Sequence, residues 1–528
     1  MAAVATGAAN SFLKTKTLLP FQADGVVTAY MRGDHMLVWD AGTGKSVGAI
    51  ALSLLCMQDD KIDHVLLICE RNKLREWVED FKVDTDLDVR KHHGPNRHKH
   101  LGKFGLPQVL VTTYETAKLD SVVKDGPRKL APGPLLSLLD GKRVLVVYDE
   151  SAKLRNRSSG IYKAQEHVLR TLRKKAEVRV LALSATPIEK AYEDGFNQLR
   201  LLVPEAMPTV KEFEGRCVRY RDMYGRPTYD QMGILWFIEL LRPHLTRKRK
   251  TDADVIEQFP PLTENYRYVE QSAAERSFYK MIEDLAFERD EPGDMGAWIL
   301  LRQIAGHPAS IIHSAKREDG SALAKEIVRT LGEEHLRSLP CAKLDELKVY
   351  LDTIIKDQGA KAVVFTFFGR SVLVELEHAL RAADFPVFTY HGGQSAAENE
   401  AAKTSFKSHQ GGAILLSSDG GARGINIPEA TYVIEYESAL THATRIQRIN
   451  RAHRINSADG PVTAMTFITA GTIEDDIFSA VLTRNEHHDR FVGDVGQELE
   501  EEFISAADRR MILQLAKSRY EGRKGRSR

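Results

Sequence analysis

The first part of the chain alternates short, continuous apolar runs with stretches in which apolar residues recur every three or four positions. Continuous apolar runs of about four to eight residues are typical of strands buried on both faces. Strands that alternate with helices predict a parallel sheet whose crossover helices cover it. The predicted strands are Met36–Trp39, Val65–Cys69, Val109–Val111, Val144–Tyr148 and Val178–Leu183.

The strand pattern lapses between residues 204 and 340, where helix formers and charged residues dominate, and then returns. The later predicted strands are Ala362–Thr366, Val387–Tyr390, Ala413–Leu416, Tyr432–Ile434 and Ala464–Ile468. The chain is therefore predicted to be an α/β protein with two parallel-sheet lobes and helical insertions between them. We expect a flexible N-terminus at 1–17, lobe 1 at 18–203, helical insertions and an inter-lobe hinge at 204–340, lobe 2 at 341–490, and a helical, basic C-terminal tail at 491–528.

Composition narrows the class of protein. The 528 residues include 43% hydrophobic and 28% charged residues, and the net charge is +1, which is typical of a soluble globular protein. No uncharged apolar stretch approaches the roughly 18–20 residues of a membrane-spanning helix, so we expect no membrane partner. The four cysteines show no close pairing, which argues against a disulfide framework or a cysteine-built zinc module. Any nucleic-acid binding must come from local basic patches.

A glycine-rich loop, Asp40-Ala41-Gly42-Thr43-Gly44-Lys45-Ser46, lies between a predicted strand and a predicted helix. Glycines let backbone N–H groups and the helix N-terminus face an anion. In such a loop Lys45 reaches the β- and γ-phosphates of a nucleotide, and Ser46 holds a magnesium ion. The generic motif also wants a glycine where this chain has Trp39, and the alternative is a glycine-rich turn beside an exposed lysine.

Two acids, Asp149 and Glu150, follow the buried strand Val144–Tyr148. Acids at the carboxyl end of a buried strand are costly unless they serve a cation or a reaction. Asp149 fits the second magnesium-directed group that the loop needs, and Glu150 fits the residue that positions or deprotonates the attacking water. Alone, such a pair is more often a solvated turn, and the loop upstream favours the ATPase interpretation.

A basic segment in the second lobe holds Gln447, Arg451 and Arg454 at helical spacing i, i+4 and i+7, which predicts one helix face. Guanidinium groups span two phosphate oxygens and neutralise transition-state charge, so this segment could supply an arginine finger. A solvated basic helix face is the alternative.

Taken in order, these motifs resemble a superfamily-two helicase core, and within it the Swi/Snf-type double-stranded-DNA translocases. The resemblance also rests on further segments: Leu19-Pro20-Phe21-Gln22, Leu74 to Phe81, His93-Gly94, Thr112-Thr113-Tyr114-Glu115, Asp149 to Asn156, Ser184-Ala185-Thr186-Pro187, Leu245 to Lys250, Leu301-Arg302-Gln303-Ile304, Lys343-Leu344, Phe365 to Phe368, His391-Gly392, Ser418 to Asn426 and Gly471 to Glu474. It covers roughly residues 18 to 478 and implies two RecA-like lobes that use ATP and Mg²⁺.

The resemblance also implies roles for single residues. Gln22 would read adenine, and Gln447 would contact the nucleotide. Ser184, Ala185 and Thr186 would couple hydrolysis to movement. Nucleic-acid phosphates would lie on Thr113, Ser418, Arg423 and Gly424.

Some residues depart from the family pattern. Ala152 stands where the acidic box usually ends in histidine, and no aromatic residue precedes the arginine segment between Glu437 and Ala443. The segment Arg423–Pro428 is closer to the RNA-helicase form of its motif. The cluster from Arg90 to His100 is rich in histidine, but its cations oppose a divalent metal, so we expect a basic surface loop there.

The expected activity is that of an ATP-driven motor on duplex DNA. The alternatives are a motor on RNA or single strands, and an ATP-gated nucleic-acid-binding adaptor without motor activity. Because the core takes nearly all residues, we expect a compact bacterial or viral motor, cytoplasmic in a bacterium or an infected host cell, or nuclear if eukaryotic. The sequence does not encode direction, processivity, strand separation or cargo.

Overall fold

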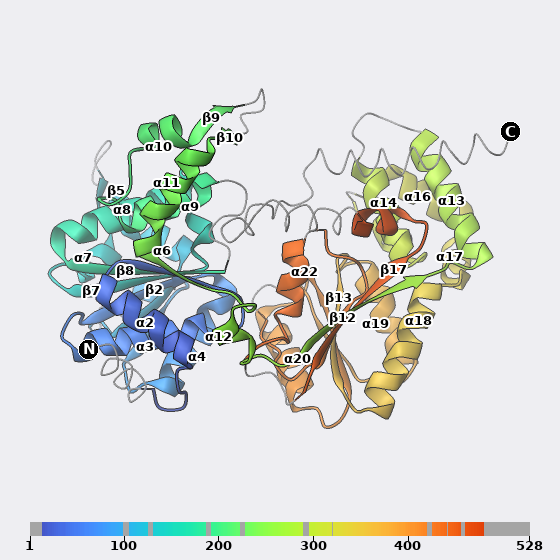
Figure 1. Ribbon diagram of the computed structural model, residues 1–528. Helices are drawn as coiled ribbons and strands as arrows, with labels where there is room; N and C mark the ends of the chain where they lie inside the picture. Colours follow the sequence, from blue (N-terminus) through green and yellow to red (C-terminus); the bar gives the residue numbers. More distant parts are fainter. Residues whose placement is uncertain are drawn as a thin grey trace. The chain divides into compact units, whose positions relative to one another are not determined.

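The computed structural model describes residues 13–98, 105–124, 130–185, 192–221, 227–288, 295–318, 320–419, 425–440, 442–455 and 460–479. The chain divides into two compact units, with the boundary between Gln258 and Phe259. Each unit is built on its own parallel sheet (Figure 1).

The first unit contains a seven-stranded sheet of order β11-β1-β8-β7-β2-β4-β3, in which every pairing is parallel. The strands are β1 (His35–Trp39), β2 (His64–Cys69), β3 (Val89–His92), β4 (Val109–Thr113), β7 (Arg143–Asp149), β8 (Glu177–Ser184) and β11 (Leu245–Lys248). The five predicted strands form the centre of this sheet. The two edge strands, β3 and β11, are short and basic, and lack the continuous apolar run on which the prediction depended.

Helices cover both faces of this sheet. The helices of the first unit are α2 (Pro20–Arg32), α3 (Lys45–Gln58), α4 (Leu74–Asp84), α6 (Tyr114–Ser121), α7 (Pro134–Leu138), α8 (Gly160–Lys175), α9 (Tyr192–Leu202), α10 (Val210–Cys217), α11 (Gln231–Leu241) and α12 (Ala253–Ile256), with short 3₁₀ turns at Arg71–Lys73, Ser151–Leu154 and Arg242–His244. One core, which contains Trp39 and Trp77, packs against α2, α3 and α4. The other, which contains Tyr114 and Tyr148, packs against α6, α8 and α9.

A helical extension with two small antiparallel strands, β9 (Val218–Arg221) and β10 (Pro227–Tyr229), joins α10 to α11. Phe196 on α9 stacks on Phe213 with ring centroids 4.3 Å apart, and Phe237 packs edge-on against both. A second antiparallel pair, β5 (Val122–Lys124) with β6 (Leu130–Pro132), follows α6.

The second unit contains a six-stranded, all-parallel sheet of order β12-β17-β16-β13-β15-β14. Its strands are β12 (Leu262–Val269), β13 (Lys361–Thr366), β14 (Val387–Tyr390), β15 (Ala413–Ser418), β16 (Tyr432–Glu435) and β17 (Val462–Thr469). The five predicted strands are present. The sixth strand, β12, was not predicted. Six of its consecutive residues, Thr263 to Tyr268, are exposed, so the strand lacks the continuous apolar run that indicates a buried strand.

The helices of the second unit are α13 (Ala273–Glu288), α14 (Met295–Gly306), α15 (Ser310–Ala315), α16 (Ala322–Leu331), α17 (Glu333–Ser338), α18 (Ala342–Leu351) with a π-helical end at Asp352–Asp357, α19 (Val372–Ala382), α20 (Ala396–Ser408) and α22 (His442–Ile449). α18 and α19 pack on one sheet face, where the core includes Leu347 and Leu376. Helices α13 to α16 form a separate core around Trp298.

The predicted fold class, two parallel-sheet lobes with helical insertions, is confirmed. The insertions between 204 and 340 divide between the units, because residues up to Gln258 belong to the first and Phe259 onward to the second. Leu13 is buried and Lys16 Nζ lies 2.7 Å from Asp84 Oδ2, so residues 13–17 of the predicted flexible N-terminus pack against α4. Residues 1–12 and the predicted tail at 491–528 lie outside the described residues, and the other boundaries stay predictions. None of the described helices is long and apolar enough to cross a membrane.

Candidate nucleotide-binding site

The glycine-rich loop joins β1 to α3, as predicted, and its glycines adopt conformations that other residues rarely take. Gly42 and Gly44 both have φ of +87°. A Cβ on Gly44 would lie 2.3 Å from the side-chain nitrogen of Gln22, so the loop requires glycine there. The Lys45 Nζ donates to the carbonyls of Trp39 at 2.6 Å and Asp40 at 3.2 Å. The lysine side chain therefore contacts its own loop, and it would have to exchange these carbonyls for phosphate oxygens to bind a nucleotide.

Gln22 links the start of α2 to this loop. It is 4% exposed, and its amide donates to the Thr43 carbonyl at 2.8 Å, while its oxygen accepts from the Leu19 N–H at 2.9 Å. The Thr43 hydroxyl in turn donates to the Asp40 carbonyl at 2.7 Å. Gln22 thus lies beside the glycine-rich loop, and its predicted contact with adenine stays a prediction.

The two acids lie at the carboxyl end of β7, two strands from β1 in the same parallel sheet. Parallel strands bring their carboxyl ends to one edge, so the loop and the acids share that edge. The charge of Lys45 acts on Asp149, although burial and then the charge of Glu150 dominate and raise the pKa of Asp149 to about 6. Glu150 has φ +50°, a left-handed conformation that costs a non-glycine residue about 1–3 kcal/mol. The strand therefore turns sharply at the second acid.

Two aromatic residues hold Asp149 in place. The Trp77 Nε1–H donates to Asp149 Oδ2 at 2.7 Å, and the Tyr114 hydroxyl donates to the Asp149 main-chain carbonyl at 2.8 Å. In the sequence, Trp77 is one apolar residue of the segment Leu74 to Phe81. Its role as a hydrogen-bond donor depends on the packing of α4 against the sheet, which helical spacing alone does not show.

The end of β11 is hydrogen-bonded to the start of the glycine-rich loop. The Asp40 N–H donates to the Lys248 carbonyl at 3.0 Å, and the Lys250 N–H donates to Asp40 Oδ2 at 2.8 Å. The segment Leu245 to Lys250, one of those on which the family resemblance rests, is thus hydrogen-bonded to the loop that would hold the triphosphate.

The predicted coupling and nucleic-acid residues of the first unit lie at the same sheet edge. Ser184 is buried at the end of β8, between β1 and β7, and Ala185 follows it. Thr186 lies outside the described residues. Thr113 is buried, and its hydroxyl accepts from the Thr116 N–H at 3.2 Å, so it caps α6. That hydroxyl already serves the fold, and its predicted contact with a phosphate stays a prediction.

In the second unit, Ser418 is buried at the end of β15, and Arg423 and Gly424 lie outside the described residues. The prediction of one helix face for Gln447, Arg451 and Arg454 is wrong, because α22 ends at Ile449. Gln447 is exposed on the helix, whereas the two arginines follow it in turns.

The two arginines after α22 bond to nearby main chain. Arg451 Nη1 donates to the Ile425 carbonyl at 3.5 Å, and Arg454 Nε donates to the Asn450 carbonyl at 3.1 Å. Both are partly exposed.

A third arginine of the same segment, Arg448, is buried in an ion network. Its guanidinium binds both carboxylate oxygens of Asp419, at 2.7 and 2.8 Å, and Glu435 Oε1 at 2.8 Å. It also donates to the main-chain carbonyl of Glu437 at 2.7 Å. Arg445 makes ion pairs with Glu435 and Glu264. Residue type and spacing do not distinguish Arg448 from Arg451, so the sequence does not show that Arg448 is the buried partner of Asp419 and Glu435.

Two more groups of buried charged residues lie in the second unit, Lys343 with Glu474 and Glu437 with Arg302. Lys343 Nζ lies 2.5 Å from Glu474 Oε2, with both side chains almost fully buried. Glu437 accepts from the main-chain N–H groups of Phe367 and Phe368, and burial, opposed by the charge of Arg302, raises its pKa to about 7. The Arg302 guanidinium lies over the Phe367 ring, 4.3 Å from its centroid.

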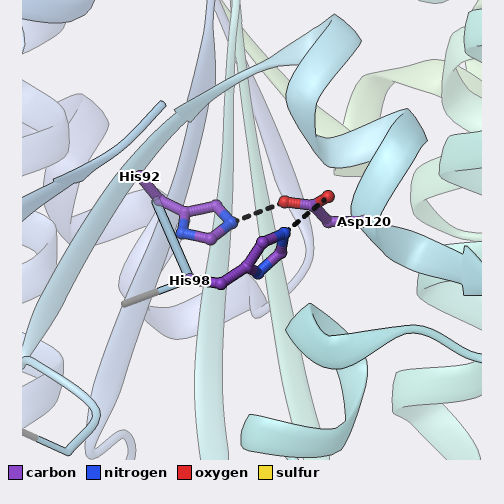
Figure 2. Close-up of side chains that lie close together, drawn as sticks. All are labelled: His92, His98 and Asp120. Carbon is purple, nitrogen blue, oxygen red and sulfur yellow. Dashed lines mark hydrogen bonds and ion pairs between the residues drawn. The ribbon is translucent and has the colours of Figure 1, made fainter. Parts of the chain in front are cut away.

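The histidine cluster of the first unit forms an ion pair within the fold rather than a metal site. His92, His98 and Asp120 converge (Figure 2), and His92 Nε2 lies 2.7 Å from Asp120 Oδ2. Arg97, however, donates to both oxygens of Asp120, at 2.6 and 2.7 Å. Burial alone would raise the pKa of Asp120, but the hydrogen bonds from Arg97 and His92 outweigh it and hold the pKa below its usual range. A divalent ion would have to displace this guanidinium. The prediction of a basic surface loop is wrong for Arg90 to His92, which lie in β3, where His92 is buried.

The first unit thus has the parts of a nucleotide hydrolase: a strand, a glycine loop, a helix, and two acids at the end of β7, two strands away in the same sheet. The chain belongs to the SNF2-related family, since the SNF2-related domain matches residues 27–316, just over half of its length. The helicase conserved C-terminal domain matches residues 342–456. The resemblance to Swi/Snf-type helicase-like ATPases is confirmed.

Several curated proteins are similar to this chain. YwqA of Bacillus subtilis, a presumed ATP-dependent helicase/translocase, is 25% identical over 93% of this chain and 51% of its own length. CHROMATIN REMODELING 4 of Arabidopsis thaliana is 24% identical over 80% of this chain and 18% of its own length. A Caenorhabditis elegans homologue of chromodomain-helicase-DNA-binding protein 3 is 24% identical over 88% of this chain and 26% of its own length. The chain therefore spans about half, or less, of these relatives. A solved SWI2/SNF2 ATPase core of Sulfolobus solfataricus in complex with double-stranded DNA is 20% identical, with 95% of this chain and 96% of that chain covered and a TM-score of 0.41.

Proposed function

We propose that this chain is a DNA-directed, ATP-driven motor that tracks along duplex DNA. The observation that carries the proposal is the shared sheet edge at which the charge of Lys45 acts on the buried Asp149. Membership of the SNF2-related family and the helicase and DNA-binding names of its relatives support DNA as the track. The strand-end loops would hold phosphates rather than bases, which suits a motor indifferent to sequence.

The residues of the first unit fit a magnesium nucleotide. The glycine at 44 leaves a space that a Cβ would fill, and Gln22 lies against it. Ser46 in the first turn of α3 and Asp149 offer the oxygen ligands that Mg²⁺ prefers. When bound, the ion would neutralise phosphate charge. Lys45 would bind the phosphates, and Glu150 would orient the attacking water and accept its proton. The part of Arg451, Arg454 and Gln447 in this chemistry stays a prediction from the family resemblance.

The direct test compares the rate of ATP hydrolysis alone, with duplex DNA, with single-stranded DNA and with RNA. Stimulation by duplex DNA above the other polymers is expected. Larger stimulation by RNA or single-stranded DNA would contradict duplex DNA as the substrate and favour the alternative, a motor on RNA or single strands, to which the Arg423–Pro428 segment points. Hydrolysis that no polymer stimulates would favour an ATP-gated adaptor and contradict the motor.

A further inference from the structure

Trp77 differs from the other deeply buried tryptophans in that its indole has a partner in the nucleotide site. Trp39, Trp77 and Trp298 are each at most 2% exposed. The indole N–H of Trp39 is buried with no hydrogen-bond partner among the described residues. The Trp77 N–H instead donates to Asp149 Oδ2 at 2.7 Å. This fold thus tolerates a buried indole without a partner, so packing alone does not explain the bond to Asp149.

The Trp77 ring is fixed by its surroundings. It lies in the first turn of α4, the helix that follows β2, and β2 pairs with β7, the strand that ends at Asp149. Phe81, one turn further along α4, packs against it with ring centroids 6.1 Å apart. A side chain held this way presents its N–H in one direction and loses little further entropy when it binds a carboxylate.

The bond fixes one oxygen of Asp149 and leaves the other available. No described residue donates a hydrogen bond to Asp149 Oδ1, whereas Oδ2 accepts from Trp77 and the main-chain carbonyl accepts from Tyr114. A carboxylate anchored through one oxygen and its main chain cannot rotate freely, so its second oxygen has a defined direction.

We propose that Trp77 is a positioning residue that orients Asp149 toward the magnesium ion of a bound nucleotide. This inference rests on the proposed function, because it assumes that Asp149 faces that ion. Partners that orient metal ligands typically contribute about 10–100-fold to metal affinity or activity. Loss of the indole N–H should therefore weaken the binding of magnesium nucleotide and leave metal-free nucleotide unaffected.

The test measures the affinity of the full chain for a non-hydrolysable ATP analogue, in Mg²⁺ and in EDTA. Trp77→Phe is expected to lower the affinity in Mg²⁺ by about 10-fold or more and leave the affinity in EDTA unchanged. A magnesium titration at fixed analogue should shift to higher concentration by a similar factor. Trp298→Phe is the matched control, since it removes an equally buried indole that lies in the core of helices α13 to α16 and does not bond to Asp149, and it should change neither affinity.

An isosteric replacement protects the test if Trp77→Phe does not fold. Benzothienylalanine at position 77 keeps the ring volume and replaces the N–H with sulfur, so only the donor is lost. Unchanged affinity for magnesium nucleotide with this replacement would overturn the proposal, as would an equal loss in Mg²⁺ and in EDTA. Lys45→Ala tests the proposed function separately: if that variant binds the analogue as tightly as the wild type, the nucleotide site itself is wrong, whatever Trp77 does.

Discussion

The two sheets carry charged residues at their carboxyl ends and use them differently. In the first unit, Lys45 bonds to carbonyls of its own loop, and Asp149 accepts one side-chain hydrogen bond from the described residues, which leaves its second carboxylate oxygen for a ligand. In the second unit, Arg448 is surrounded by acidic partners, and Lys343 is paired with Glu474. Under the proposed function the first edge receives a charged ligand, whereas the charged side chains of the second are paired with one another.

The largest expected effect concerns catalysis at the first edge. Glu150→Gln should lower ATP turnover by about 10²–10⁴-fold, since a positioned acid–base group contributes about that much. The amide keeps the shape of the side chain, so nucleotide binding should persist. Phosphate release at saturating ATP and DNA checks the rate, and titration calorimetry checks binding. Hydrolysis near the wild-type rate would remove Glu150 from the mechanism.

The next effect concerns stability at the second edge. Arg448→Ala should lower the free energy of unfolding by about 3–5 kcal/mol, because Asp419 would lose the guanidinium that binds both its oxygens and Glu435 would keep only Arg445 as an ion-pair partner among the described residues. Urea unfolding followed by circular dichroism measures it. Arg451→Ala is the control: it should change stability by less than about 1 kcal/mol while lowering turnover. Equal destabilisation by the two substitutions would contradict the distinction drawn between these arginines.

The smallest effect is a pH dependence. The pKa of Glu437 in the folded state, about 7, lies above its ordinary value of 4.5, so the folded state binds this proton more tightly than the unfolded chain. Stability from this group is therefore greatest below pH 4.5 and decreases as the pH rises through 7. Between low and high pH this group should lower the free energy of unfolding by an amount on the order of 1–3 kcal/mol. Glu437→Gln, which keeps an acceptor for the Phe367 N–H, should abolish that pH-dependent loss. Unfolding curves at pH 5 and pH 8 for both proteins measure the difference, and identical pH dependence would contradict it.

The sequence predicted the central strands and the residues of the first edge because apolar runs and glycine spacing are local signals. It missed β3, β11 and β12, which lack a continuous apolar run and lie at sheet edges. It also placed Arg451 and Arg454 on a helix that ends before them. The partners of Trp77 and Arg448 are distant in the sequence, at Asp149 and Asp419, so no local pattern could reveal them. Side-chain chemistry was therefore predictable where it depended on neighbours along the chain, and not where it depended on tertiary packing.

The pairing of β11 with β1 has a consequence for dissecting the molecule. A fragment that stopped at residue 203 would lack Leu245–Lys248, so β1 would become a bare edge strand open to self-association. Asp40 would also lose its bonds to Lys248 and Lys250, directly beside the glycine turn. An autonomous N-terminal half must therefore extend through Lys250, more than sixty residues after Ser184, where its last central strand ends.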